Sequence, residues 1–572
     1  MAMKADTIFY NGYIYNTPFK KFFKGYFSVK GEKILHIGIG DIRSDIEYDN
    51  AVDLQGKWVI PGLIDSHMHV ESSMLAPRPF AKLMVENGIT TVVSEPHEIA
   101  NVTGMDGVLA MIEAAKGAVM DIFYAVPSSV PSTSAEFETT GDVVDMPQLM
   151  ELIKHKEVVC LGEVMNTYKI LTDPDDKQNQ FVKYLKENRP DMPLEGHCPR
   201  IVGSDLNQYV YTGIGSDHTE HDVDAFMQRV FNGMLFQVQD KMAKPEIAKA
   251  IKDHELYENV ALVTDDTTPS NLINHGHLNA VVMEMVKCGL DFEKAVYCAS
   301  ATPARRMRLY DRGQIMPGLL ADFSILDTLE EIKPVQTYKN GRLVFDKSVG
   351  NTFETEKAFP DSFYKTMKLD HVTPEIFDIK TPVENGEISV NGLEVLPDFT
   401  RTPKVTKTLT AKDGKLMLDS ETGKIIVLER HGKNGNVFGT IATGTCVVDG
   451  AVATSYAHDH HNLLVLGGSN EDMALAANTV IDNCGGLAVV QNGKVIAQAQ
   501  LEVCGLMSER DPYEVAKSIE DVESAMRAIG YVHYNPVMSL ATTCLPVSMD
   551  VKITDKGLVD VINGKIISIF ND

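Results

Sequence analysis

The stretch Val59-Ile-Pro-Gly-Leu-Ile-Asp-Ser-His-Met-His-Val70 decides the fold, because it is an apolar run that ends in two histidines. Residues i and i+2 of a strand point to the same face, so His67 and His69 are predicted to share one face at a strand end. Two imidazoles placed in this way can bind one cation together. A His-x-His pair alone is a weak signal, because two exposed or hydrogen-bonded histidines give the same pattern.

Apolar, strand-like runs recur after this stretch and alternate with helix-like segments. The runs end near residues 67, 94, 127, 162, 197, 217, 238 and 264, and helix-like segments such as 79–86 and 107–115 lie between many of them. Eight strand–helix units over roughly 250 residues are typical of a (β/α)8 barrel. Active sites of this fold lie at the carboxyl ends of the strands, so His67 and His69 are predicted to face the barrel mouth.

Strand-like segments flank the barrel on both sides. Residues 7–15, with a turn expected at Asn11-Gly12, and residues 26–37 precede it, and residues 322–326 and 337–345 follow it. These flanks predict a small β-sandwich domain built from both ends of the barrel segment. The predicted division is a β-sandwich domain of residues 1–58 with 322–348, the barrel of residues 59–321, a linker of residues 349–380 and a C-terminal α/β domain of residues 381–572.

The C-terminal domain is predicted to be α/β because it mixes apolar β-like runs with a clear helix start. The β-like runs are residues 424–428, 463–466 and 487–490. Ser469 precedes the acidic residues and the apolar periodicity of residues 473–481, which is the pattern of a helix N-cap followed by its helix.

The balance of charges limits the partners. The chain has 53 Lys and Arg against 79 Asp and Glu, a net charge of −26, which argues against nucleic acid but not against a small uncharged purine base.

No apolar run is long enough to cross a bilayer, and the N-terminus lacks the apolar core of a signal peptide. The eight cysteines form no Cys-x-x-Cys pair. We therefore expect a cytoplasmic protein with reduced thiols and no membrane partner.

The other predicted strand ends carry metal-type ligands. Glu163 ends the fourth strand, His197 the fifth, His218 the sixth, and Asp265 with Asp266 the eighth. Each has a plain alternative: Glu163 could be a cap, His197 a buried hydrogen-bonded ring and Asp265 a turn residue. Four histidines, one Glu and one Asp at mouth-facing strand ends are hard to explain as caps. Together they predict a metal site.

These segments resemble the amidohydrolase superfamily, and the longer motifs resemble one family within it, the adenine deaminases of the bacterial type. The resemblance covers almost the whole chain. Its motifs are Pro61-Gly-Leu-Ile-Asp-Ser-His-Met-His69, His69-Val-Glu-Ser-Ser-Met74, Glu95-Pro-His-Glu-Ile-Ala-Asn-Val102, Gly162-Glu-Val-Met-Asn166, Gly196-His-Cys-Pro199, Ser216-Asp-His218, Thr264-Asp-Asp266, Gly276-His-Leu278, Ala301-Thr-Pro-Ala304, Gly318-Leu-Leu-Ala-Asp322, Ala457-His-Asp-His-His-Asn462 and Asn470-Glu-Asp-Met-Ala-Leu475.

The resemblance implies a site for two divalent metal ions, Mn2+ or Fe2+, with Zn2+ as an alternative. It implies that His67, His69 and Asp265 hold one ion and that His197 and His218 hold the other, with Glu163 bridging them. The implied reaction is the hydrolytic deamination of adenine to hypoxanthine and ammonia by a metal-activated hydroxide, a step of purine salvage. Asp265 and Glu163 are the expected proton-relaying groups. A homodimer is the expected assembly.

Further residues are weaker candidates for substrate binding: Glu71, Ser72, Glu95, His97, Asp266, His458 and His460. Glu95 and His97 lie two apart after the second strand, so both are predicted to face the mouth. Their plain alternative is a capping Glu and a packed His. The cluster of residues 458–461 has a metal-like composition, but a structural network between domains explains it equally well.

Two other functions stay open at this point. One is a different amidohydrolase reaction, on a cyclic amide or another amino-heterocycle, and the other is a metal-binding scaffold without catalysis. The sequence departs from the family pattern at Thr219, Gln239 and Thr267, all expected near the mouth where a substrate is recognised. These departures bear on the substrate more than on hydrolysis, because none is a predicted metal ligand.

Overall fold

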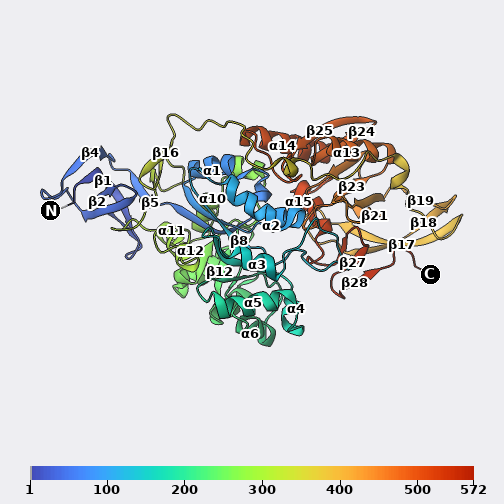
Figure 1. The fold of residues 1–572 in the computed structure, drawn as a ribbon, viewed down its shortest axis with the longest axis horizontal. Helices are drawn as coiled ribbons and strands as arrows, with labels where there is room; N and C mark the ends of the chain where they lie inside the picture. Colours follow the sequence, from blue (N-terminus) through green and yellow to red (C-terminus); the bar gives the residue numbers. More distant parts are fainter. Residues whose placement is uncertain (1–2, 572) are drawn as a thin grey trace.

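The computed structural model describes residues 3–571 and has three parts along its long axis (Figure 1). A β-rich part containing the first strands lies at one end, a barrel lies in the middle, and the C-terminal part lies at the other end. Among the described residues, no helix is long and apolar enough to cross a membrane.

The middle part is a barrel of eight parallel strands, which confirms the predicted (β/α)8 fold. Two parallel sheets form its wall. The Gly215 amide donates to the Leu194 carbonyl at 3.0 Å, which joins the two sheets on one side, and the Asp265 amide donates to the His67 carbonyl at 3.1 Å on the other. The strands are β6 (Leu63–Met68), β7 (Ile89–Ser94), β8 (Asp121–Val126), β9 (Val158–Val164), β10 (Leu194–Gly196), β11 (Ser216–Asp217), β12 (Leu235–Val238) and β13 (Val260–Leu262).

Helices surround the barrel and pack against its wall. In α8, for example, Ile247, Ala248 and Ile251 are buried, the spacing of an amphipathic helix against a core. Both faces of a parallel barrel wall are covered, so strands such as β7 are buried along their whole length. The helices are α1 (Pro77–Glu86), α2 (His97–Ala114), α3 (Met146–Leu152), α4 (Thr167–Thr172), α5 (Lys177–Asn188), α6 (Gly203–Tyr211), α7 (Val223–Phe231), α8 (Pro245–Asp253), α9 (Pro269–Asn274), α10 (Leu278–Lys287), α11 (Phe292–Cys298) and α12 (Ala301–Arg306).

Strands from both flanks of the barrel share one eight-stranded sheet, as predicted. Its core includes Phe9, Phe27 and Phe323, and the Phe9 and Phe27 rings stack with centroids 4.9 Å apart. The sheet order is β16-β15-β14-β5-β1-β2-β3, with β4 also paired to β1. The strands are β1 (Ala5–Asn16), β2 (Lys21–Lys30), β3 (Lys33–Ile39), β4 (Tyr48–Asp53), β5 (Trp58–Pro61), β14 (Phe323–Leu326), β15 (Gln336–Lys339) and β16 (Arg342–Asp346).

The turn predicted at Asn11-Gly12 is wrong, because β1 runs through both residues. Asn11 has a left-handed backbone (φ 58°), and the pairing with β2 shifts by one residue between Tyr10 and Gly12, which makes the dipeptide a β-bulge. A Cβ on Gly12 would lie 2.5 Å from Leu54 Cδ1, so glycine is needed here for a close approach to Leu54. The dipeptide Asn11-Gly12 is compatible with a turn and with a bulge. Pairing of β1 with β2 on both sides of it makes it a bulge.

The C-terminal part is built on a nine-stranded sheet whose two faces are both covered. Residues of β20 alternate between two hydrophobic cores: Ile426 and Leu428 pack with α13, and Ile425 and Val427 belong to the core that includes residues of α14. The sheet strands are β17 (Gly386–Val395), β18 (Lys404–Lys412), β19 (Lys415–Met417), β20 (Gly423–Leu428), β21 (Val437–Gly444), β22 (Ala451–Thr454), β23 (Leu463–Gly467), β24 (Gly486–Gln491) and β25 (Lys494–Gln500).

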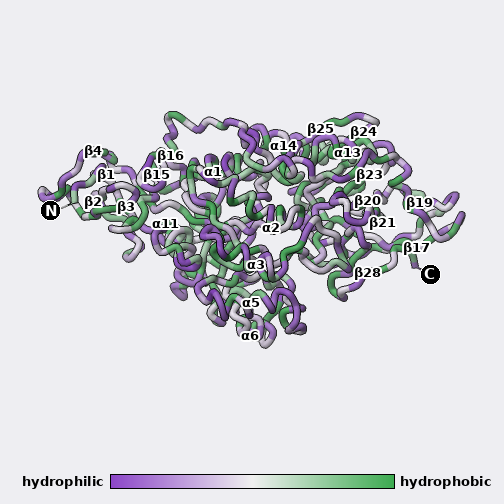
Figure 2. The backbone as a smooth tube through the Cα atoms, in the orientation of Figure 1, coloured by the Kyte–Doolittle hydropathy of each residue, from purple (hydrophilic) through white to green (hydrophobic). Residues whose placement is uncertain are grey.

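Helix α13 begins as predicted, because the Ser469 side chain accepts a hydrogen bond from the Asp472 amide. Figure 2 shows hydrophobic and hydrophilic residues alternating along outer helices such as α14, which buries Val515, Ile519 and Val522. The remaining elements of this part are α13 (Asn470–Asp482), α14 (Pro512–Ala528), α15 (Pro536–Ala541), β26 (Val551–Ile553), β27 (Leu558–Asp560) and β28 (Lys565–Ile567).

The segment predicted to be a linker contains two short 3-10 helices, η4 (Asp361–Tyr364) and η5 (Pro374–Phe377). Phe363 and Phe377 are buried in the hydrophobic cores of the neighbouring parts. This segment is therefore packed against the rest of the protein. The division into domains at residues 58, 321, 348 and 380 stays a prediction.

Candidate metal centre

His67 and His69 lie at the end of β6 and both rings turn toward Asp265. The His67 Nε2 atom lies 3.5 Å and the His69 Nε2 atom 3.2 Å from Asp265 Oδ1. Asp265 follows β13 with a left-handed backbone (φ 60°), a conformation that Asp adopts more readily than most residues. A backbone bridge from Met68 to Asp265 joins the two strand ends. Three atoms of metal-ligand type therefore converge at this side of the mouth.

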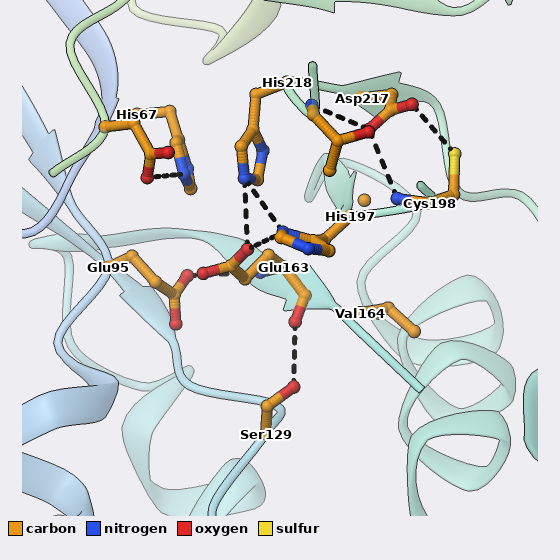
Figure 3. Close-up of polar contacts among 12 residues, drawn as sticks. His67, Glu95, Ser129, Glu163, Val164, His197, Cys198, Asp217 and His218 are labelled. Carbon is orange, nitrogen blue, oxygen red and sulfur yellow. Dashed lines mark hydrogen bonds and ion pairs between the residues drawn. The ribbon is translucent and has the colours of Figure 1, made fainter. Parts of the chain in front are cut away.

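Glu163, His197 and His218 form a second group across the mouth (Figure 3). The Glu163 Oε2 atom lies 2.8 Å from His197 Nδ1 and 3.2 Å from His218 Nε2. The two ring nitrogens are 3.1 Å apart. Glu163 is in β9, and the histidines directly follow β10 and β11. The carboxyl ends of three neighbouring strands thus bring together residues that lie up to 55 positions apart in the sequence.

The Glu163 carboxylate lies between the two groups. Its Oε1 atom is 3.5 Å from His69 Nε2, while its Oε2 atom faces His197 and His218. The hydroxyls of Ser128 and Ser129 donate to the Glu163 carbonyl at 2.6 and 3.1 Å and hold the backbone in place. This is the position that a carboxylate bridging two cations requires.

Glu95 supports this arrangement from the end of β7. Its Oε2 atom accepts a hydrogen bond from the Glu163 amide at 3.2 Å. A Cβ on Gly162 would lie 1.9 Å from the same oxygen, so only glycine allows the Glu95 carboxyl to lie this close to β9. The Glu95 carbonyl lies 3.0 Å from His69 Nδ1, and this contact orients the His69 ring.

Burial and histidine contacts act in opposite directions on the acids of the mouth. Burial alone would raise the pKa of Asp265, but its contacts with the His67 and His69 rings outweigh burial and hold that pKa well below its ordinary value. Burial opposes ionisation of Glu163 in the same way, and hydrogen bonds from His197 and His218 keep its pKa well below the ordinary value. Both carboxylates are therefore ionised at neutral pH, as metal ligands must be.

Several polar atoms of the mouth have no hydrogen-bond partner among the described residues. The buried atoms His67 Nε2, His218 Nδ1 and Glu95 Oε1 are among them. An unpaired buried polar atom costs roughly 1–3 kcal/mol. A cation next to the His67 nitrogen would remove part of this cost. Imidazole and carboxylate donors suit Mn2+, Fe2+ and Zn2+, so the residues present fit the predicted ions.

Three of the weaker candidates line the wall near Asp265. The Ser72 hydroxyl donates to Asp266 Oδ1. Glu71 is fully buried, and its carboxylate accepts from the Ile99 amide at 3.3 Å, so it anchors the start of α2. Burial raises the pKa of Glu71 to about 7.

The other weaker candidates connect the mouth to the C-terminal part. The His97 Nδ1 atom lies 3.5 Å from Glu163 Oε1, and its Nε2 atom lies 3.8 Å from Asp459 Oδ1. The His458 Nδ1 atom is 2.6 Å from Glu98 Oε1. His460 is buried apart from this group, and its Nδ1 atom accepts from the Asn462 amide at 3.0 Å.

Two contacts of the mouth were not foreseen. The Gln239 side chain donates from Nε2 to Asp265 Oδ2 and to the His218 carbonyl, both at 2.8 Å, so this residue orients Asp265. Glu98 faces His97 and His458, although strand alternation after β7 would have turned it away. Because α2 begins at His97, the chain is already helical at Glu98 and strand alternation no longer applies. The sequence feature that could have indicated Glu98 is its position directly after Glu95-Pro-His97.

A cavity of about 870 Å3 opens beside His197. Barrel residues such as Met165, Asn166 and Arg200 line one wall, and Val547 and Ile562 of the C-terminal part line the opposite wall. The His197 side chain is 30% exposed, whereas that of His218 is 2% exposed. The cavity therefore gives a small molecule access to His197, the one exposed member of this group.

Thr219, which the sequence placed near the substrate, belongs to a buried ionic network behind β11. The Asp217 Oδ2 atom accepts from Arg229 Nε at 2.5 Å and lies 2.9 Å from His221 Nε2, and Asp217 Oδ1 accepts from the Thr219 hydroxyl at 2.9 Å. Figure 3 shows Asp217 also holding Cys198, the residue after His197. The network thus fixes the segments that carry His197 and His218.

Replacing Asp217 with Asn is expected to lower the free energy of unfolding by roughly 3–5 kcal/mol, because it leaves the fully buried Arg229 charge unpaired. Urea unfolding measures this loss. The control is Asp253→Asn, which removes an exposed partner of Lys249 and is expected to cost less than about 1 kcal/mol. Equal losses in the two variants would contradict a stabilising role for the Asp217 network.

The same network predicts how stability depends on pH. Burial opposes ionisation of Asp217, but the His221 hydrogen bond and the Arg229 charge hold its pKa below the ordinary value. The stabilisation is therefore fully present above an unfolded-state pKa of about 3.9 and is lost as the pH falls below it. The melting temperature of the wild type is expected to fall more steeply in acid than that of Asp217→Asn.

The sequence matches two known families. Residues 58–353 match the amidohydrolase family, and residues 400–565 match the adenine deaminase C-terminal domain. The chain is 42% identical over 573 residues to an adenine deaminase of Clostridium perfringens, covering 99% of this chain and all of the relative, and 39% identical over 570 residues to adenine deaminase 2 of Shouchella clausii, covering 99% of both. Among solved structures, a beta-aspartyl dipeptidase from Fervidobacterium islandicum matches 62% of this chain and all of its own, with a TM-score of 0.46 and 15% identity.

Proposed function

Because this chain belongs to the adenine deaminase family of the amidohydrolase superfamily, we propose that its barrel mouth binds two divalent metal ions and hydrolyses adenine to hypoxanthine and ammonia. One observation carries the two-ion proposal: the two oxygens of Glu163 face two different groups of imidazoles. A site for a single ion would need only one of these groups.

The proposed ligands of the first ion are His67, His69 and Asp265, and those of the second are His197 and His218, with Glu163 shared. We propose Mn2+ or Fe2+ as the native ions, since imidazole and carboxylate ligands suit both. When bound, such ions lower the pKa of a water molecule between them and supply hydroxide near neutral pH.

Asp265 is the proposed general base and acid. Its Oδ2 atom is held by the Gln239 amide, and its Oδ1 atom faces the two histidines of β6, so the carboxylate has a fixed orientation. It takes up the proton of the attacking water and returns it to the exocyclic amine, which leaves as ammonia. The hydroxyl added to C6 gives up its own proton as the C6 carbonyl forms, and that proton ends on the ring nitrogen beside C6, a transfer in which Glu163 or Asp266 is proposed to assist.

The cavity beside His197 is the proposed route of adenine into the mouth. It is large enough for a purine, and its lining mixes apolar side chains such as Met165 with amide and charged ones such as Asn166 and Arg200. Contacts to the purine are proposed for the remaining candidates near the mouth, which are Glu71, Ser72, Glu95, His97 and Asp266. Substrate binding by His458 and His460 stays a prediction from the sequence, because His458 faces Glu98 and His460 is buried apart from this group. The homodimer and the cytoplasmic location stay predictions from the sequence.

A substrate panel with controlled metal content tests the proposed function. Removal of metal by a chelator is expected to abolish ammonia release from adenine, and two equivalents of Mn2+ or Fe2+ per chain are expected to restore it. Loss of the adenine absorbance gives an independent readout of the same reaction. Adenine left unchanged by the reconstituted protein, with hydrolysis of a cyclic amide or another amino-heterocycle instead, would overturn the assignment.

A further inference from the structure

A second cluster of metal-type ligands lies where the C-terminal part meets the start of α2. We propose that this outer cluster, made of Glu98, His458, Asp459 and His461, binds a third divalent transition-metal ion. The His458 Nδ1 atom is 2.6 Å from Glu98 Oε1 and 3.6 Å from Asp459 Oδ1. His461 Nε2 contacts the other oxygen of Glu98. One carboxylate of the barrel thus meets two imidazoles from a single loop of the C-terminal part, and the Asp459 carboxylate of the same loop lies beside one of them.

The outer cluster is separate from the mouth but adjoins it through one ring. The His97 Nε2 atom lies 3.5 Å from Glu98 Oε1 and 3.8 Å from Asp459 Oδ1, while its Nδ1 atom faces Glu163 Oε1 at 3.5 Å. His97 therefore stands between the two sites. The four residues of the outer cluster make no contact of this kind with His67, His197 or His218 within the part of the chain that the structure describes.

The burial and charge of the outer cluster favour a cation. All four side chains are at most 2% exposed. Across residues 3–571, no lysine or arginine forms an ion pair with Glu98 or Asp459. Two buried carboxylates without such a partner are costly, because charges taken out of water must be paired. Protonated histidines could supply part of the compensation, and a divalent ion bound to neutral histidines supplies it completely.

An unpaired atom in the outer cluster points the same way. The buried atom Asp459 Oδ2 has no hydrogen-bond partner among the described residues, although the other oxygen of the same carboxylate lies 3.6 Å from His458 Nδ1. A network built only for hydrogen bonding would be expected to satisfy both oxygens. Two imidazoles and two carboxylates form a donor set suited to Mn2+, Fe2+ or Zn2+.

An ion in this place would link the two parts of the protein that form the substrate cavity. Its ligands come from α2 of the barrel and from the loop between β22 and β23. It would also fix the His97 ring, whose second nitrogen faces Glu163, and so act as a positioning element for the mouth. This role predicts that the outer ion can be lost while the two ions of the mouth stay bound.

Anomalous scattering from crystals of the full-length protein loaded with Mn2+ tests the proposal directly. Three peaks per chain are expected, two in the mouth and one between Glu98 and the loop of residues 458–461. A wild-type map with peaks only in the mouth overturns the proposal. The outer peak is scored independently of the mouth peaks, so failure of the two-ion centre is distinguishable from failure of the outer site.

Variants add a test in solution that uses metal content. His461→Gln and Glu98→Gln are expected to lower bound Mn2+ from three to two ions per chain, with the mouth peaks retained in crystals. His371→Asn is the control, because His371 pairs with Asp482 on the exposed surface, and it should retain three ions. Three ions in both cluster variants would overturn the assignment of these ligands. If a variant fails to fold, the wild-type map still decides.

Discussion

Replacing Glu163 with Gln is expected to lower kcat/KM for adenine by at least ~10³-fold, equivalent to about 4 kcal/mol of transition-state stabilisation. The amide keeps the shape of the carboxylate but loses its charge, and its nitrogen cannot serve as a ligand. One group of imidazoles would then lose its shared carboxylate oxygen. Steady-state kinetics and metal analysis on the same preparation should show activity and bound metal falling together.

The matched control for this variant is Glu509→Gln. Glu509 is also a buried carboxyl, but it accepts hydrogen bonds from the Ala358 amide and the Tyr364 hydroxyl and belongs to neither group of proposed ligands. It is expected to keep wild-type activity and metal content. A Glu163→Gln variant that retained both ions and full activity would refute the bridging role.

Replacing Asp265 with Asn is expected to lower kcat by about 10²–10⁴-fold, the range for loss of a positioned general acid–base group. Asn cannot accept the proton of the attacking water, although it can still accept the hydrogen bond from Gln239. The expected signature is a fall in kcat that excess Mn2+ does not restore. Asp265 is also a proposed ligand, so metal affinity is expected to fall as well, and kinetics at saturating metal separate the two effects.

Asp472→Asn provides the matched control for Asp265→Asn. Asp472 is a buried carboxylate of α13 that accepts from the amides of Asn492 and Gly493. It should leave kcat unchanged. Full recovery of the Asp265→Asn variant by added metal would mean that Asp265 only binds the ion and does not transfer protons.

The sequence predicted the barrel well because each strand leaves a local signal. The apolar runs ending near residues 94, 162 and 238 correspond to β7, β9 and β12, whose last residues are Ser94, Val164 and Val238. A strand of a closed parallel barrel is buried on both faces, so its residues are apolar without interruption. Knowing where each strand ends was then enough to place the polar residues that follow it at the mouth.

Features that depend on contacts between distant segments could not be predicted in this way. Asn11-Gly12 has the composition of a turn, yet pairing with β2 and contact with Leu54 make it a bulge. Thr219 follows a predicted ligand, but its hydroxyl is held by Asp217 in the network of Arg229. Gln239 was expected near the mouth, but its contact with Asp265 was not, because that contact exists only where β12 and β13 are neighbours in the wall.

The sequence by itself determined the barrel, the strand ends and the six residues proposed as ligands, because these depend on local periodicity and on chemically distinctive side chains. Tertiary structure alone decided that Glu163 lies between two groups of imidazoles and that Glu98 meets His458 and His461, which lie 360 and 363 positions further along the chain. The physical reason is that distances between side chains are set by packing of whole strands, helices and loops. No local pattern records which distant loop will cover the mouth of a barrel.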